Sequence, residues 1–181
     1  PAPIEVTVEM LDQQWGQTED VAIVGNIAYV AIGPRLVALD VTDPAAPTLL
    51  SRSAILPGTA TAVVVDGDVA YVAAGSAIVA LDVTDPAASL TVLNQVDVGS
   101  VITQLELMDD TLVAGLSIPA PTPAEDDSGR IVTLDASTPD RLRTLDSVEL
   151  PWPVHALALN DNYLFVANPA AADFYVLDAA N

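Results

Sequence analysis

The chain has 181 residues, of which 51% are hydrophobic and only 4% aromatic, so its core must consist mainly of Val, Leu, Ile and Ala. Twenty-five acidic residues face five basic ones, all arginine, which gives a formal net charge of −20. A field of this sign repels nucleic acid and anionic lipid headgroups. Cysteine is absent, which excludes disulfides and thiol chemistry. The sequence holds neither an apolar run of the roughly 18 residues that span a membrane nor the pattern of a signal peptide at its start.

One phrase recurs along the chain. It is LDVTDP at Leu39–Pro44 and Leu81–Pro86, LDASTP at Leu134–Pro139 and LDAAN at Leu177–Asn181. The steps between the successive aspartates are 42, 53 and 43 residues. Repeats of this length are typical of stacked or circular arrays of small supersecondary units.

The second repeat shows the four pieces of each unit. We expect strands at Thr61–Gly67, Asp68–Gly75, Ala77–Val83 and Leu90–Val98, with an Asp-Gly hairpin between the first two. The first and third repeats contain the same four pieces, and the last stops after three. Val, Ile and Thr between Gly, Asp and Pro favour strands over helices, so we predict an antiparallel all-β fold.

The missing strand is found at the start of the chain. Pro3–Leu11 alternates like the other fourth strands, and joining Asn181 to Pro1 on paper restores the repeated phrase with a step of 43 residues. We therefore predict a single domain, a β-propeller of four four-stranded blades in which this N-terminal strand completes the last blade. The expected blades cover about residues 20–57, 58–99, 100–150, and 153–181 with 3–11. The alternative is a four-blade segment of a larger propeller or array.

The first two repeats resemble a known family. VALDVTDPAAPTLL and AYVAAGSAIVALDVTDPAA are similar to the LVIVD repeat, a bacterial and archaeal β-propeller repeat. The resemblance implies a propeller that is secreted or displayed on the cell surface. It implies no catalytic residue, because the biochemistry of the family is not established.

The aspartates of the repeated phrase admit two interpretations. A ring of carboxylates could hold Ca²⁺, which takes six to eight oxygen ligands. Alternatively each carboxylate accepts backbone N–H bonds in an Asx turn. Recurrence in every unit favours the turn, so we expect a structural role for six aspartates: Asp40, Asp43, Asp82, Asp85, Asp135 and Asp178.

The irregular features all fall on one predicted face, formed by the loops between second and third strands and between blades. In repeat proteins such irregularity often marks the working surface. It holds the insertion Ser117–Arg130, whose acidic group is a weak Ca²⁺ candidate. Trp15 and Trp152 are either exposed anchors for a partner or packing between blades. The candidate partner-binding residues are Trp15, Arg35, Glu125, Asp126, Asp127, Arg130, Trp152 and His155.

Three functions are open at this point. We expect first a non-catalytic, secreted or cell-surface module that binds a protein or glycan partner. Second is a structural building block that self-assembles into a filament, sheath or larger surface protein. Third is a hydrolase or lyase with carboxylates at the channel mouth, which rests on fold analogy. Neither a GxSxG elbow nor an HExxH motif occurs, and His155 is the single histidine. We therefore expect neither a catalytic residue nor a cofactor, with Ca²⁺ the one candidate ion.

Overall fold

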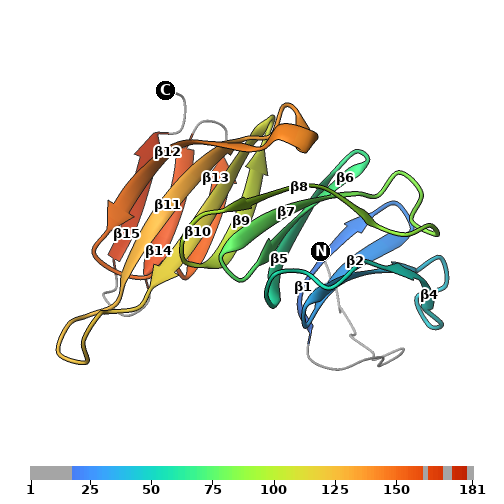
Figure 1. The fold of residues 1–181 in the computed structure, drawn as a ribbon, viewed down its shortest axis with the longest axis horizontal. Coiled ribbons are helices and arrows are strands. Elements are labelled where there is room, and N and C mark those ends of the chain that lie inside the picture. The colour runs from blue at the N-terminus through green and yellow to red at the C-terminus, as the bar shows by residue number, and fades with distance from the viewer. Residues whose placement is uncertain (1–17, 161–162, 169–172, 179–181) are drawn as a thin grey trace, which may run out of the picture.

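The computed structural model describes residues 18–160, 163–168 and 173–178, which form four antiparallel sheets arranged side by side (Figure 1). Each sheet is called a blade here. Blade 1 holds β1 (Thr18–Val24), β2 (Ile27–Ile32), β3 (Arg35–Asp40) and β4 (Thr48–Arg52), and blade 2 holds β5 (Ala60–Asp66), β6 (Val69–Ala74), β7 (Ala77–Asp82) and β8 (Thr91–Asp97). Blade 3 holds β9 (Val101–Met108), β10 (Thr111–Ile118), β11 (Ser128–Asp135) and β12 (Arg143–Leu150), and blade 4 holds β13 (Ala156–Asn160), β14 (Tyr163–Asn168) and β15 (Asp173–Asp178). A short 3₁₀ helix, η1 (Pro139–Arg141), which the sequence did not predict, precedes β12.

The predicted all-β propeller fold is confirmed, and each blade is an up-and-down sheet. The hairpins follow from local sequence. Gly25 and Gly67 sit in the two-residue turns after β1 and β5 with φ of 58° and 51°, a conformation that costs glycine little. In blade 3 the same place is taken by Asp109, with φ of 48°, one of the residue types that tolerates this region.

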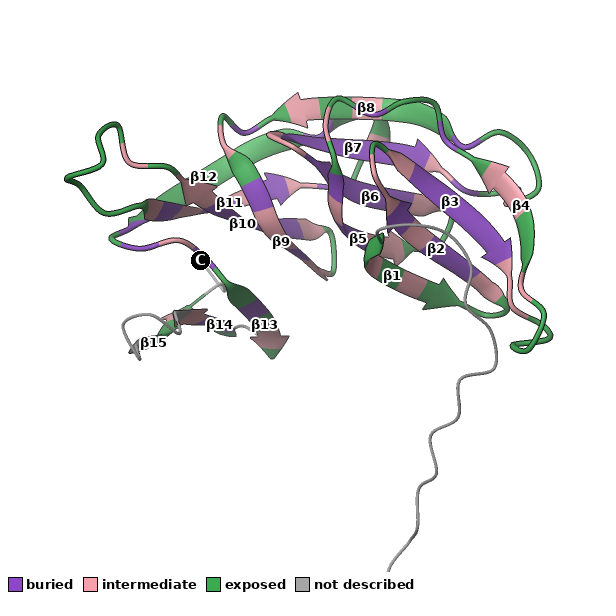
Figure 2. Cartoon of the chain, turned by 90° about the horizontal axis from the view of Figure 1, so that it is seen from below, coloured by how far each residue is buried: buried purple, intermediate pink, exposed green. Residues whose placement is uncertain are grey.

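Most of the described core lies between neighbouring blades, and one small cluster, Ala28, Val37 and Leu39, lies within blade 1 (Figure 2). Residues alternate along each strand, so each sheet has a front face toward the previous blade and a back face toward the next. Tyr29 on the back face of blade 1 packs with Val63 and Val72 on the front face of blade 2. Because β6 and β7 are covered on both faces, almost every residue in them is buried.

Polar side chains on the innermost strands also join consecutive blades. The Thr61 hydroxyl donates to the carbonyl of Ile102 on β9 at 2.8 Å. The Thr103 hydroxyl, 42 residues further on, donates to the carbonyl of Val154 just before β13 at 2.7 Å. The same repeat position therefore links blade 2 to blade 3 and blade 3 to blade 4.

The described strands form an arc that is not closed. The innermost strands pack in the order β1, β5, β9, β13. Figure 2 shows blade 1 and blade 4 at the two ends of this arc. Blade 4 has three strands in the described part of the chain. The predicted fourth strand, Pro3–Leu11, lies outside the described residues, so closure by that strand stays a prediction.

Candidate interaction face

Blade 3 differs from its neighbours by a hairpin that projects beyond the rim of the arc. In blades 1 and 2 the second and third strands are joined by two-residue turns. In blade 3, β10 and β11 each run to eight residues, and pairing continues to Ile118↔Ser128 before the chain loops through 119–127. The loop extends away from the sheets at the lower left of Figure 1. The insertion predicted from the sequence is thus an extended hairpin with a nine-residue tip.

The tip is ordered by its own polar groups. The backbone N–H of Ala120 donates to Asp127 Oδ1 at 2.8 Å, and the Thr122 hydroxyl donates to Glu125 Oε1 at 3.1 Å. Asp126 between them is exposed. Within the described residues, no three acidic or histidine side chains converge in a way that could hold a metal ion. Glu125 and Asp127 accept hydrogen bonds within the loop, and the exposed Asp126 presents negative charge to solvent.

The two predicted arginines have intramolecular partners. The Arg130 guanidinium, at the base of the hairpin, donates from Nε to Glu149 Oε1 on β12 at 2.7 Å. The Arg35 guanidinium, on blade 1, donates to the backbone carbonyl of Ser53. Each contact connects neighbouring segments of one blade. Both guanidinium groups are therefore already engaged within the chain.

The structure separates the aromatic and histidine candidates. Trp152 is only 7% exposed and packs between blades 3 and 4, with its ring centroid 5.1 Å from that of Tyr175. This burial favours packing over an exposed anchor, because the indole covers much apolar area at the blade junction. His155 is exposed on the same rim as the hairpin. Trp15 lies outside the described residues.

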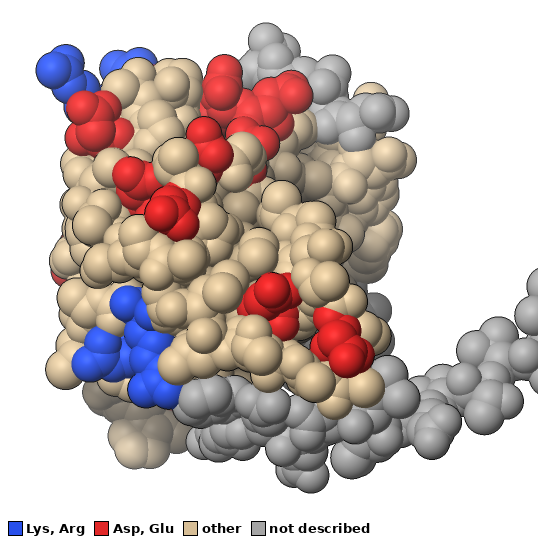
Figure 3. Space-filling model, turned by 90° about the vertical axis from the view of Figure 1, so that its right-hand side faces the viewer, with Lys and Arg blue, Asp and Glu red and all other residues tan. Residues whose placement is uncertain are grey.

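The predicted sites are thus spread around one rim rather than gathered in a pocket. Arg35 begins β3 of blade 1, the hairpin belongs to blade 3, and His155 precedes β13 of blade 4. Figure 3 views the blade 1 side of the molecule, where a group of basic side chains gathers at one lower corner and acidic side chains lie mainly above and across from it. The feature that rises above this rim is the blade 3 hairpin.

The repeated aspartates lie at the opposite rim and make the contacts of Asx turns. The backbone N–H of Thr42 donates to Asp40 Oδ1 at 2.8 Å, and that of Thr84 donates to Asp82 Oδ1 at 2.9 Å. Asp43 and Asp85 accept from Ala45 and Ala87 in the same way, each at 3.0 Å. Hydrogen bonds from the side chains of Thr42 and Thr84, and then from their backbone N–H groups, favour the charged carboxylates and so lower the pKa of Asp40 and Asp82.

Asp135 has the strongest set of partners in this series. Ser137 donates to Oδ1 from its hydroxyl at 2.6 Å and from its backbone N–H at 3.0 Å, and Arg143 donates to Oδ2 from Nη2 at 2.7 Å. The Ser137 hydroxyl and then Arg143 lower the pKa of Asp135 to about 2. The last member, Asp178, ends β15, and the residues after it lie outside the described part.

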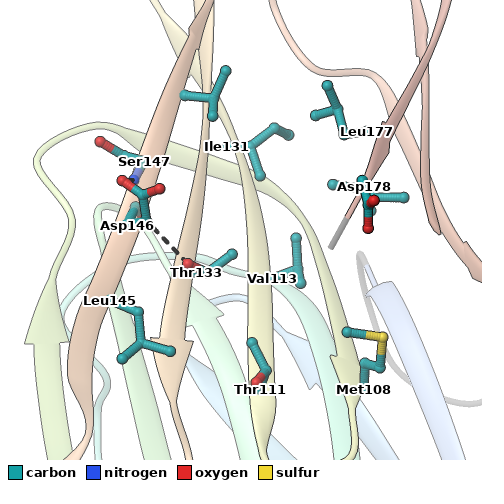
Figure 4. A pocket seen from close by; sticks show the side chains of 12 residues that line it. Met108, Thr111, Val113, Ile131, Thr133, Leu145, Asp146, Ser147, Leu177 and Asp178 are labelled. Carbon is teal, nitrogen blue, oxygen red and sulfur yellow. Dashed lines mark hydrogen bonds between the residues drawn. The ribbon is translucent and has the colours of Figure 1, made fainter. Parts of the chain in front are cut away.

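A groove of about 490 Å³ lies between blade 3 and blade 4, a feature that sequence analysis did not identify (Figure 4). Leu145 and Val148 on β12 form one wall, and Leu177 and Asp178 on β15 form the other. Thr133 and Asp146 also line the groove, and the Thr133 hydroxyl donates to the backbone carbonyl of Asp146 at 3.4 Å. In the other three blades a fourth strand lies beside the third. The groove therefore marks the side of blade 4 where a further strand would add.

Two carboxylates lie close together on the innermost strands, where an enzyme of this fold could place a site. Burial and then the nearby Asp20 charge raise the pKa of Glu106. Asp20 itself accepts from the backbone N–H of Val63 and of Val21, each at 2.8 Å. Asp20 Oδ2 thus links β1 to β5, whereas Oδ1 accepts from the next residue of its own strand, and the link gives this carboxylate a structural role.

The LVIVD repeat matches two adjacent segments of the chain, residues 15–54 and 57–97. These segments include blades 1 and 2, so the predicted resemblance is confirmed for the first two repeats, and the chain carries LVIVD repeats. No curated protein sequence matches the chain. Among the described residues, no helix is long and apolar enough to cross a membrane.

Several solved structures share the fold at low sequence identity. The computationally designed protein Ika4 is 18% identical with a TM-score of 0.66, and the match covers 93% of this chain and 95% of that one. The designed protein Ika8 is 16% identical with a TM-score of 0.66, covering 89% of this chain and 45% of that one. A putative 6-phosphogluconolactonase from Bacteroides uniformis is 11% identical with a TM-score of 0.64, covering 90% and 54%. The chain thus corresponds to about half the length of the last two, and the likeness is one of fold.

Proposed function

We propose that this LVIVD-repeat propeller is a non-catalytic module that binds a protein partner with the projecting hairpin of blade 3, residues 117–130. One observation carries the proposal. Blades 1 and 2 join their second and third strands by two-residue turns, whereas blade 3, the third blade that the structure describes fully, extends these two paired strands past the rim. The hairpin tip is exposed throughout 121–127. Function in repeat scaffolds concentrates in such insertions.

The chemistry of the tip favours a basic partner. Glu125, Asp126 and Asp127 follow one another in a chain with 25 acidic and five basic residues. Arg130, which could neutralise them, is bonded to Glu149 instead. An excess of one charge steers a partner of the opposite charge and sets its approach. We therefore propose a partner segment that contains Arg or Lys, with a glycan as the alternative ligand.

A peptide-display screen against the immobilised chain tests this function, with a glycan array beside it. We expect selected peptides to be rich in Arg and Lys. Binding should weaken about tenfold or more when 119–127 is replaced by Asn-Gly, a two-residue turn that suits the Ile118↔Ser128 pair. The triple change Glu125→Gln, Asp126→Asn and Asp127→Asn should weaken binding in the same direction.

The matched control removes three charges from the opposite rim, with Asp66→Asn, Asp109→Asn and Asp110→Asn, which line a separate acidic depression. This variant should bind the selected peptides nearly as well as the unmodified chain. Equal binding by the Asn-Gly variant would overturn the role of the hairpin. Glycans bound on the array without any selected peptide would overturn the protein partner in favour of the glycan.

We also propose that the chain acts outside the cell or at its surface. The excess of acidic residues and the LVIVD repeats support this location. Fractionation of the producing cells with an antibody against the chain should recover it in the medium or the surface fraction. Recovery from the cytoplasm alone would contradict the proposal.

Catalysis is the alternative that the similarity to a putative lactonase raises, and that similarity extends to the fold alone. A general acid and base must both be placed at the reacting bond. Of the two neighbouring inner carboxylates, Asp20 accepts from two backbone N–H groups. Glu106 therefore has no second available carboxylate there, among the described residues, with which to form an acid–base pair. Turnover of lactones or other hydrolase or lyase substrates that is lost in Glu106→Gln would establish the alternative.

A further inference from the structure

The two ends of the arc expose apolar side chains whose counterparts in blade 2 are buried. Val21 on β1 is 53% exposed, whereas Val63, 42 residues later on β5, is 4% exposed. Val176 on β15 is 51% exposed, whereas Ala80 at the matching position of β7 is fully buried. The difference arises because Val63 and Ala80 have a neighbouring blade against them and the two end residues do not.

The exposed face of blade 4 is the face that blades 1, 2 and 3 turn toward their successors. Phe165 and Phe174 stack on it with their centroids 5.7 Å apart, beside Tyr163 and Val176. The position of Phe165 is that of Tyr29 and Tyr71, both of which are buried against the next blade. The back face of blade 4 thus carries the residue types of a blade junction without a blade beyond it.

The exposed face of blade 1 is the complementary one. Val21 and Ile23 on β1 are exposed on the side away from blade 2, whereas Ala28, Val37 and Leu39 on the same face of β2 and β3 are buried in a small cluster of their own. The matching residues of blade 2, Val63 and Val65, pack on the back face of blade 1. A back face and a front face of this pattern already meet three times within the chain, so the two ends are complementary by repetition.

We propose that two copies of this chain join end to end, with blade 4 of each copy packed on blade 1 of the other, to form one closed ring. Two such contacts related by a twofold axis leave no unpaired end. This surface is separate from the blade 3 hairpin, so the inference is independent of the proposed function.

Two further features fit a second copy at this place. His155 stands 52 residues after Thr103, at the repeat position where Thr61 and Thr103 reach the carbonyl of the next innermost strand, and its side chain is exposed. The groove of about 490 Å³ lies beside β15, on the side of blade 4 where a fourth strand would pair.

The test is the mass of the 181-residue chain in solution, by light scattering during size-exclusion chromatography. We expect twice the chain mass of 18.7 kDa. Ile23→Asp should give single chains by charging the front face of blade 1, and Val176→Asp should do the same on the back face of blade 4. Both residues are exposed in one chain, so circular dichroism should show unchanged folding.

Mixing the two variants distinguishes end-to-end contact from other arrangements. In a mixed pair, the intact back face of Ile23→Asp meets the intact front face of Val176→Asp. The mixture should therefore regain the mass of two chains at a concentration where each variant alone is single. Ile55→Asp and Val92→Asp, at positions 71% and 50% exposed but away from both end faces, are the matched controls and should remain paired.

A single-chain mass for the unmodified protein at hundreds of micromolar would overturn the proposal and favour closure within one chain or a different partner on these faces. Loss of pairing in only one of the two end-face variants would also overturn it, because a self-complementary contact uses one face twice. Failure of the mixture to pair again would have the same consequence. If the two control variants also lost pairing, an added charge at any exposed position would be enough to separate the copies. That result would likewise refute the assignment of the contact to the end faces.

Discussion

Blade 2 and blade 4 share a strand order but differ in what surrounds them. Blade 2 is covered on both faces, and β7 is buried along its whole length up to Asp82. Blade 4 is covered on one face, so Leu164 and Val166 on β14 are buried whereas Tyr163 is 50% exposed. The comparison shows that burial in blades 2 and 4 depends on which of their faces meets a neighbouring blade.

This difference has an energetic consequence. Stability in repeat proteins is approximately a sum of intrinsic terms for each unit and of interface terms between neighbours. A blade with two junctions should therefore tolerate substitution less well than a blade with one. A buried residue of blade 2 and the exposed residue of blade 4 at the same position of the repeat can be compared directly for their contribution to stability.

The largest effect is expected from a cavity at the junction of blades 2 and 3. Ile78 is fully buried in that cluster, so Ile78→Ala should lower the free energy of unfolding by about 2–5 kcal/mol. Phe174→Ala at the matching position of blade 4 should cost far less in the single chain, because Phe174 is exposed. Urea denaturation followed by circular dichroism measures both. Similar losses in the two variants would refute the view that the junction supplies the stability.

The next effect concerns how closely blades 3 and 4 approach. A Cβ added at Gly115 would meet the side chain of Val154 too closely, whereas blades 1 and 2 accommodate Ala31 and Ala73 at the matching positions. Gly115→Ala should therefore destabilise the chain by about 1–3 kcal/mol. The double variant Gly115→Ala, Val154→Ala should be less stable than the unmodified chain. Its loss of unfolding free energy should be smaller than the sum of the losses in the two single variants. Strict additivity in denaturation would show that the two side chains do not meet.

The repeat made most of the fold predictable from sequence. The expected strand Thr61–Gly67 is β5 (Ala60–Asp66), and Leu90–Val98 is β8 (Thr91–Asp97), because Asp-Gly and Pro turns set the ends of these strands. Period and turn chemistry are local properties, and four copies of one pattern reinforce one another. The all-β prediction succeeded for that reason.

The contacts of the candidate face were harder to predict. The Arg130–Glu149 pair depends on the register of β11 and β12, which shifts at an irregularity between Thr133 and Leu134. The sequence does not reveal this shift. The burial of Trp152 depends on Tyr175 in another strand, a long-range contact. The repeat position of His155, in contrast, could have been found by aligning it with Thr61 and Thr103.

A smaller effect should come from the threonine links between innermost strands. Thr103→Val removes the hydrogen bond to the carbonyl of Val154 and should lower the free energy of unfolding by about 0.5–1.5 kcal/mol. Thr61→Val should act similarly through Ile102. His155→Val, at the matching position of the open end, should leave the stability of the single chain nearly unchanged. A loss at His155 equal to that at Thr103, measured on single chains by denaturation, would mean that the end of the arc is already covered.

The smallest effect should be a pH-dependent one at the turn that ends β11. Ser137 and Arg143 lower the pKa of Asp135 from its ordinary value of 3.8 to about 2, so the folded chain favours the charged carboxylate. A group whose pKa is lowered by folding stabilises the fold above its unfolded pKa, and this contribution is lost as the pH falls through the folded value. The unmodified chain should therefore melt at a higher temperature than Asp135→Ala above about pH 4, and the two melting temperatures should converge toward pH 2. The matched control is Asp126→Ala on the exposed hairpin tip. It also removes one negative charge, but from a carboxylate outside the turn that ends β11. A gap between Asp135→Ala and the unmodified chain that stays constant from pH 6 to pH 2 would show that the side chain acts by packing rather than through its charge.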